Sequence, residues 1–336
     1  MKRSTPAAAA VIAFGLAFSA PAMAQSGADF FKGKTVNYIV ATAPGGGYDV
    51  YGRLTAEYMQ KYLPGSTFVV RNMPGAGHVL GANAIYASAP DGLTFGTFNT
   101  GLIYTQIVAH AAAKFDLTKM SWLGKAASDP RVFVVSTQSG ITSFDQLRKL
   151  PKNVNFATSG IGGASYVETL VLARALKLPL TLQTGYNGTE DMQAMRRGEI
   201  AGTIASRSSF DAFVGNGYGR MIAQIGGRDK DLPQLSELVS EDHAKPLIAL
   251  LRTQGEIARL TAGPPGIPAD RLEALRSAYR KAMEDPQAQA KALKLGRPLD
   301  PAYGEDVLTL VREAVSQTPE ITALLKEAMQ RPKRER

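Results

Sequence analysis

The sequence predicts an α/β protein made of two similar units, each a mostly parallel sheet flanked by helices. Short runs of β-branched and aromatic residues alternate with amphipathic stretches, which is the pattern of strands joined by helical crossovers. Most strands end in a corner rich in Gly and Pro, and the arrangement occurs before residue 100 and again after residue 130. Ligands on such sheets bind at the carboxyl ends of the strands, so these corners are the candidate sites.

The N-terminus has the three parts of a secretory signal peptide. Lys2 and Arg3 give a charged start, residues 7–20 are small and apolar, and Ala22-Met23-Ala24 is an A-x-A cleavage site. The apolar run is too short to span a membrane. We therefore expect residues 1–24 to be removed and the protein to be exported.

Composition excludes several classes of function. The 336 residues, 45% of them hydrophobic, are enough for about two domains. The chain has no cysteine, and its three histidines (His78, His110 and His243) are far apart, so we expect no metal and no cofactor. The net charge of +9 favours anionic ligands. Nucleic acid is not expected, because the chain is exported and aromatic and basic residues are not interleaved.

The first unit is expected to hold three strands and two helices. The strands are predicted over residues 35–43, 68–70 and 93–98, and the helices over residues 49–62 and 79–89. The first helix has an apolar stripe formed by Val50, Leu54, Tyr58 and Tyr62. The third strand ends at Asn99-Thr100-Gly101.

The first corner, residues 42–49, joins the first strand to the first helix. Pro44 biases the residue before it to an extended conformation, and the three glycines after it permit positive φ. Asp49 lies at the helix start, with Arg53 one turn further on the same face. Free N–H groups beside a helix N-terminus form an anion site. A plain tight turn is the alternative, because G-G-G is not the dinucleotide-binding fingerprint.

The second unit repeats this design. Its strands are predicted over residues 132–135, 154–158, 180–184, 200–205 and 221–225. A capping box at Ser143 opens one helix, and a third corner at residues 158–165 opens another. From Pro264 onward the chain reads as helical, with helices over residues 268–283, 306–316 and 320–330. We expect this closing segment to pack on the first unit.

The corner motifs follow one another in a characteristic order. They are Pro44-Gly45-Gly46 with Asp49 and Arg53, Asn72-x-Pro74-Gly75-Ala76-Gly77, Gly81-Ala82, Pro90-Asp91-Gly92, Phe156-Ala157-Thr158-Ser159-Gly160-x-Gly162, Gly185-Tyr186-Asn187-Gly188, Gly198-Glu199-Ile200, Gly266-Ile267-Pro268 and Asp285-Pro286. In order and spacing this set resembles the substrate-binding receptors of tripartite tricarboxylate transporters, the TctC or Bug family, over nearly the whole exported chain.

The resemblance implies a two-lobed periplasmic binding protein of type II topology. Lobe 1 would comprise residues 25–130 and 248–336, and lobe 2 residues 131–247. Such a receptor binds a small organic acid between its lobes in the periplasm and delivers it to a two-subunit membrane permease. It would be a monomer, and it would not be an enzyme.

Candidate ligand contacts come from both lobes. Lobe 1 contributes Thr42, Gly45, Gly47, Tyr48, Gly75, Ala76 and Thr100. Lobe 2 contributes Thr158, Ser159, Gly163, Ala164, Ser206 and Arg207.

Two departures from the family pattern bear on the ligand. Tyr48 stands where many relatives have Ser or Thr, and its ring is expected to stack on a flat ligand. Ala205-Ser206-Arg207 stands where many relatives carry an acid that orients an amino or hydroxyl group. We therefore expect a dicarboxylate or aromatic carboxylate rather than an amino acid, with Arg207 binding a second acid group.

Two other functions are compatible with this fold class. A ligand-sensing domain that feeds a signalling partner would use the same architecture. A secreted α/β hydrolase would need a nucleophile and a base, but Thr158-Ser159-Gly160 lacks the first glycine of G-x-S-x-G and the corners contain no histidine.

The signal peptide gives the first testable prediction. Export should remove residues 1–24, so that the mature chain begins at Gln25. The intact mass of the protein from a periplasmic fraction measures this directly. A mass that still includes Lys2 and Arg3 would contradict it.

Overall fold

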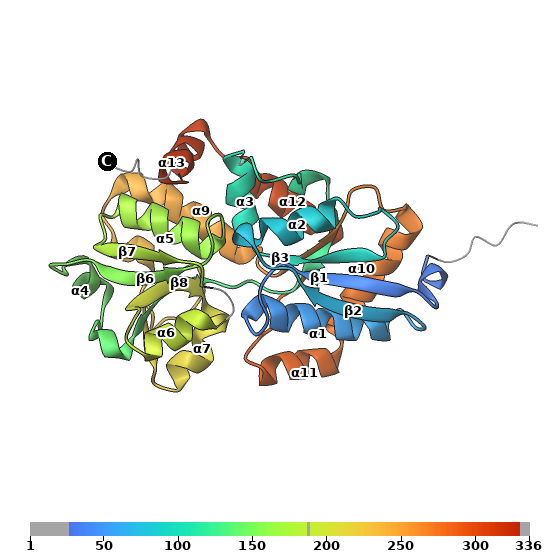
Figure 1. Cartoon of the computed structure of the whole chain (residues 1–336), viewed down its shortest axis with the longest axis horizontal. Helices are drawn as coiled ribbons and strands as arrows, with labels where there is room; N and C mark the ends of the chain where they lie inside the picture. The colour runs from blue at the N-terminus through green and yellow to red at the C-terminus, as the bar shows by residue number, and fades with distance from the viewer. Residues whose placement is uncertain (1–26, 110, 187–188, 330–336) are drawn as a thin grey trace, which may run out of the picture.

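The computed structural model describes residues 27–109, 111–186 and 189–329 and consists of two lobes side by side (Figure 1). The predicted signal peptide, His110, Asn187, Gly188 and the basic tail from residue 330 lie outside the described residues. Each lobe is built on one mixed sheet with helices on both faces. The predicted α/β class with two similar units is confirmed.

The sheet of lobe 1 has six strands in the order β11-β4-β10-β3-β1-β2. Strand β1, next to the edge strand β2, pairs in parallel with β2 and β3, whereas β10 runs antiparallel to β3 and β4. The strands are β1 (Thr35–Val40), β2 (Thr67–Asn72), β3 (Thr94–Phe98), β4 (Ser121–Lys125), β10 (Leu260–Gly263) and β11 (Ala302–Tyr303).

The sheet of lobe 2 has five strands in the order β7-β6-β8-β5-β9. Here β6 pairs in parallel with β7 and β8, and β5 runs antiparallel to β8 and β9. The strands are β5 (Arg131–Ser136), β6 (Val154–Thr158), β7 (Leu180–Thr184), β8 (Gly202–Ser206) and β9 (Gly219–Ile225). In each sheet a reversed strand, β10 in lobe 1 and β5 in lobe 2, is the first that the chain forms after crossing from the other lobe.

Alternation along β1 supplies both faces of the lobe 1 core. Val36, Tyr38 and Val40 face one set of helices, whereas Ile39 faces the other. The first set comprises α1 (Gly47–Lys61), α10 (Ala269–Glu284) and α11 (Pro286–Lys294). The second set comprises α2 (Val79–Tyr86), α3 (Gly101–Ile107) and α12 (Gly304–Val315). A strand that is apolar on both faces therefore becomes the centre of a three-layer lobe.

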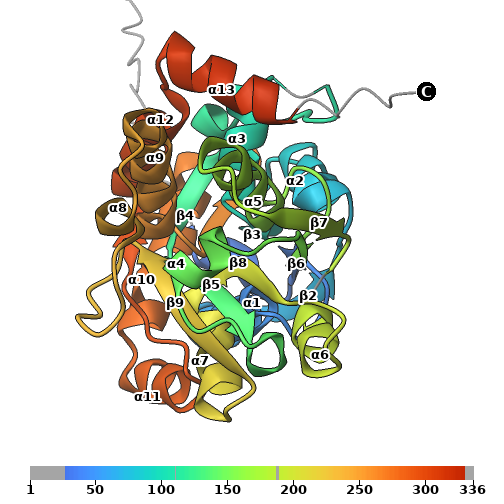
Figure 2. The same ribbon diagram turned by 90° about the vertical axis from the view of Figure 1, so that its left-hand side faces the viewer.

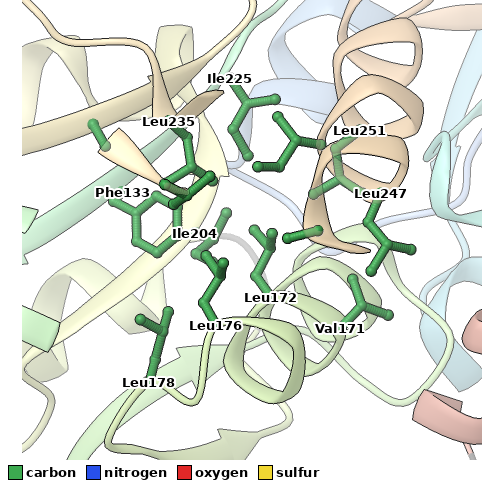
Figure 3. Packing of buried hydrophobic residues seen from close by; sticks show 14 of the residues in the cluster. Phe133, Val171, Leu172, Leu176, Leu178, Ile204, Ile225, Leu235, Leu247 and Leu251 are labelled. Carbon is green, nitrogen blue, oxygen red and sulfur yellow. The ribbon is translucent and has the colours of Figure 1, made fainter. Parts of the chain in front are cut away.

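Helices also cover both faces of the lobe 2 sheet. On one face lie α5 (Ala164–Ala175) and α9 (Lys245–Glu256), with the short helices α4 (Phe144–Arg148) and α8 (Leu235–Leu238) beside them. On the other face lie α6 (Glu190–Arg196) and α7 (Arg207–Gly215). Figure 3 shows Leu247 and Leu251 of α9 pointing into the core formed by α5 and the strands.

The expected assignment of residues 248–336 to lobe 1 is wrong for two helices. The apolar face of α9 is buried in the lobe 2 core. Helix α13 (Pro319–Met329) lies along α5, and its Leu325 is fully buried in the same core (Figures 1 and 2). Arg174 of α5 donates a hydrogen bond of 2.6 Å to the carbonyl of Glu327. The chain thus crosses between the lobes a third time, after α12, because the apolar stripe of α13 finds its partner on lobe 2.

This packing of α13 is testable. Leu325→Ala should lower the free energy of unfolding by about 2–5 kcal/mol, because it leaves a cavity in the lobe 2 core. Leu293→Ala on α11 is the matched control, since that leucine is 67% exposed and Leu325 is 0% exposed. Urea unfolding of both variants measures the difference. Equal losses would contradict the packing of α13 on lobe 2.

Candidate functional site

A cleft between the lobes contains two neighbouring chambers. The inner chamber has a volume of about 120 Å³ and the outer chamber about 300 Å³. Both are bordered by Gly46 and Gly47 of lobe 1 and by Met192 and Ser209 of lobe 2. The strand ends and helix starts of both lobes meet here, as the position of the corners predicted.

The first corner places the start of α1 at the inner chamber. Gly45 has a φ of +85°, and Gly46 is the extended N-cap before Gly47. The Asp49 carboxylate accepts hydrogen bonds from the Gly45 N–H at 2.9 Å and from Asn72 at 2.8 Å, and it pairs with Arg53 as predicted. Partial burial opposes the charged form, but the hydrogen bonds outweigh it and lower the pKa of Asp49. Asp49 therefore fixes the conformation of the corner. The N–H groups of the first residues of α1 remain available to a ligand in the cleft.

Two hydroxyl groups from opposite lobes are buried at the inner chamber without hydrogen-bond partners. They are Oγ1 of Thr42, just after β1, and Oγ of Ser159, just after β6. A buried polar group without a partner costs about 1–3 kcal/mol. Both hydroxyls therefore have an unfilled hydrogen-bonding capacity that a guest molecule can satisfy.

Arg131, the first residue of β5, lines the same chamber in a fixed position. Its guanidinium donates to Glu168 at 2.6 Å and to Ser206 Oγ at 2.7 Å. Glu168 is fully buried on α5, and Tyr104 of lobe 1 donates to it at 3.4 Å. The positive charge of Arg131 is thus balanced inside the protein.

Arg259 lines the chamber from the second crossing between the lobes. It forms a buried ion pair with Asp129 of the first crossing, and Ser208 Oγ donates to the same carboxylate at 2.6 Å. The guanidinium lies over the ring of Tyr48, 4.3 Å from its centroid. Because Arg259 covers one face of that ring, the expected stacking of Tyr48 on a ligand is limited to the other face.

A ligand in the inner chamber would therefore meet hydroxyl and N–H dipoles rather than an arginine without an acidic partner. Each of its arginines has a carboxylate partner. Burial lowers the pKa of His78, which is neutral and bonded through Nδ1 to the Ala41 carbonyl at 2.9 Å. Asp191 also lines the chamber, and burial raises its pKa to about 6 although the Met192 N–H donates to it.

Two predicted ligand contacts, Gly163 and Ala164, instead lie at the contact between the lobes. A side chain at Gly77 would meet the backbone of residues 161–163, and one at Gly101 would meet the Ala164 N–H. Asn99 Oδ1 accepts from the Gly101 N–H at 2.7 Å and from the Ala164 N–H at 3.2 Å. The predicted contacts in this region that do not line the chamber are Gly75, Ala76, Thr100, Gly163 and Ala164. Glycines here allow backbone to approach backbone.

The remaining predicted contacts divide between the cleft and other roles. Those that line the inner chamber are Thr42, Gly47, Tyr48, Ser159 and Ser206. Gly45 borders the outer chamber, and Thr158 Oγ1 donates to the Gln183 carbonyl at 3.3 Å.

The prediction for Arg207 is corrected by its ion pairs. As the first residue of α7, it pairs with Asp229 at 2.6 Å and with Asp211 at 3.5 Å, and it does not line either chamber. Its guanidinium charge is therefore engaged by the acids of lobe 2.

The residues lining the inner chamber that sequence reasoning missed include His78, Asn99, Arg131, Asp191 and Arg259. For Asn99 and Arg131, the one sequence feature that could have indicated a role in the site is their position directly beside a predicted strand. Asp191 and Arg259 lie outside every corner motif. Among the described residues, no cluster of three acidic or histidine side chains is placed to hold a metal ion.

Comparison with known proteins agrees with this architecture. The profile of the tripartite tricarboxylate transporter family receptor (TctC) matches residues 52–325. A UPF0065 protein from the tcbD–tcbE intergenic region of Pseudomonas sp. is 25% identical over 284 residues, which cover 80% of this chain and 79% of that protein.

Two solved structures share the fold. The periplasmic binding protein BugD has a TM-score of 0.74 at 22% identity, covering 88% of this chain and 97% of BugD. An R. palustris protein solved with adipate has a TM-score of 0.72 at 18% identity, with coverage of 88% and 97%. The profile match extends over most of the chain, and the chain therefore belongs to the TctC family of periplasmic solute-binding receptors.

Proposed function

We propose that this protein is a periplasmic receptor that captures a small organic acid between its lobes and delivers it to the membrane permease of a tripartite tricarboxylate transporter. The observation that carries the proposal is the pair of buried, unpartnered hydroxyls of Thr42 and Ser159, which come from different lobes and belong to residues that line the inner chamber. A carboxylate has acceptor sites enough for both. The start of α1 at Gly47 adds N–H groups and a favourable dipole for an anion.

Binding and lobe closure are coupled in this proposal. Thr42 belongs to lobe 1 and Ser159 to lobe 2, so one carboxylate that accepts from both stabilises the arrangement in which the lobes touch. The permease would then distinguish the loaded receptor by its closed shape.

The ligand class follows from the charges around the cleft. The arginines of the inner chamber are already paired, so the chamber suits one carboxylate held by dipoles. TctC receptors bind small organic acids, and one structural relative was solved with adipate, a dicarboxylate. Because Arg259 already occupies one face of the Tyr48 ring, the cleft favours a dicarboxylate over an aromatic acid.

Removal of either hydroxyl tests the carboxylate site. Thr42→Val and Ser159→Ala should each weaken binding of the best organic acid by about 1.5–3 kcal/mol, the range for hydrogen bonds to charged groups. Thr309→Val on the exposed face of α12 is the control. Calorimetry with the acid chosen by a thermal-shift screen measures the losses. Unchanged affinity in both cleft variants would remove the carboxylate from this position.

The ionisation of Asp191 distinguishes a ligand that carries only acid groups from an amino acid, because the two should bind with opposite pH dependence. A bound anion is favoured when the Asp191 carboxyl is protonated, so affinity should fall by about tenfold as the pH rises through about 6. Asp191→Asn should abolish this pH dependence while binding persists. An amino acid would behave in the opposite way, because its ammonium group needs the charged carboxylate. Titration calorimetry between pH 5 and 8 distinguishes the two.

A further inference from the structure

The outer chamber brings together two arginines from different lobes. Arg196 ends α6 in lobe 2, and Arg297 follows α11 in lobe 1. Both line the chamber, whose volume of about 300 Å³ exceeds that of the inner one. The predicted donor for a second acid group, Arg207, is absent from it.

These two arginines differ from their neighbours in lacking an acidic partner. Arg197 pairs with Glu199 and Arg259 with Asp129, whereas no carboxylate of the described residues lies within ion-pair distance of Arg196 or Arg297. Arg297 donates through Nη1 to the carbonyls of Ser208 and Gly296, and its Nε is buried without a partner. Burial and the nearby Arg259 lower the pKa of Arg297, so an anion beside it would relieve an unfavourable environment.

The walls of the outer chamber suit a chain of methylene groups. Met192 and Phe213 contribute apolar surface, and Tyr218 lies 5.9 Å from Phe213 between ring centroids. The guanidinium of Arg196 is held over the Tyr218 ring at 4.3 Å, which fixes its orientation at low entropic cost. Gly46 and Gly47 border both chambers, so no lobe 1 side chain separates them at this point.

We propose that the outer chamber is a second acid-binding subsite, in which Arg196 and Arg297 bind the distal carboxylate of an extended organic diacid. This inference rests on the proposed function, in which the inner chamber holds the first carboxylate. The diacid chain passes between Gly46–Gly47 and Met192, and its two ends engage both lobes. Arg196 and Arg297 thereby determine the preference for diacids over monoacids.

The test compares diacids with monoacids of the same chain length. Calorimetry is run on the full exported chain with dicarboxylates from succinate to suberate and with monocarboxylates from butanoate to octanoate. The variants are Arg196→Gln, Arg297→Gln and the double variant. Arg197→Gln is the matched control, because this neighbouring arginine is exposed, pairs with Glu199 and lines neither chamber. Circular dichroism and thermal unfolding confirm that each variant folds.

The expected result is a loss specific to diacids. The double variant should bind the preferred diacid at least about tenfold more weakly, and its affinity for the matched monoacid should change less than about twofold. Arg197→Gln should bind both as the unaltered protein does. Equal losses for diacid and monoacid, or no loss for either, would overturn the subsite while leaving the receptor function intact. If no member of either series binds the unaltered protein, the proposed function fails, and the subsite fails with it.

Discussion

The cleft depends on the buried ion pair between Arg259 and Asp129, which joins two of the chain segments that cross between the lobes. Each residue lies on one of the first two crossings, and the crossings are further joined by hydrogen bonds from Asp129 N to Gly255 O at 2.7 Å and from Ala126 N to Arg259 O at 3.1 Å. Ser208 ties the start of α7 to the same carboxylate. Loss of one partner alone would leave an uncompensated buried charge, which typically costs about 3–5 kcal/mol. The guanidinium also explains the glycine at position 47, since an added Cβ would lie 2.9 Å from Arg259 Nη2.

Local pattern predicted most of the fold, and long-range pairing accounts for what it missed. The parallel strands around β1 and β6 are short runs rich in β-branched and aromatic residues that end at glycine corners, so local pattern located them. Strand β10 has only four residues, and it is a strand because β3 and β4 flank it. Helix α9 was not predicted from the sequence. The helix corresponding to α13 was predicted, but no local signal specified which lobe would bury it.

The site was predicted where it depends on the backbone and missed where it depends on distant partners. The corner at Thr42–Tyr48 follows from proline, glycine and a helix start, all of which are local. Arg131 depends on Glu168, and Arg259 on Asp129, across separations that no spacing rule relates. Arg207 looked free in the sequence because its partner Asp229 follows the next strand. Glycine motifs were also ambiguous, since the same residue type serves a ligand cavity in one corner and lobe contact in another.

Part of the contact between the lobes is made by main-chain atoms alone. Gly77 meets the backbone of residues 161–163, and Gly101 meets that of Ala164, with no side chain between them. The residues that vary the chemistry of the cleft, such as Asp191, Arg196 and Arg297, do not take part in these glycine contacts. In the proposed receptor, the backbone that brings the lobes together and the side chains that select the ligand therefore lie in separate parts of the chain. A few side-chain substitutions in the cleft can then exchange one ligand for another while the lobes keep the same contact.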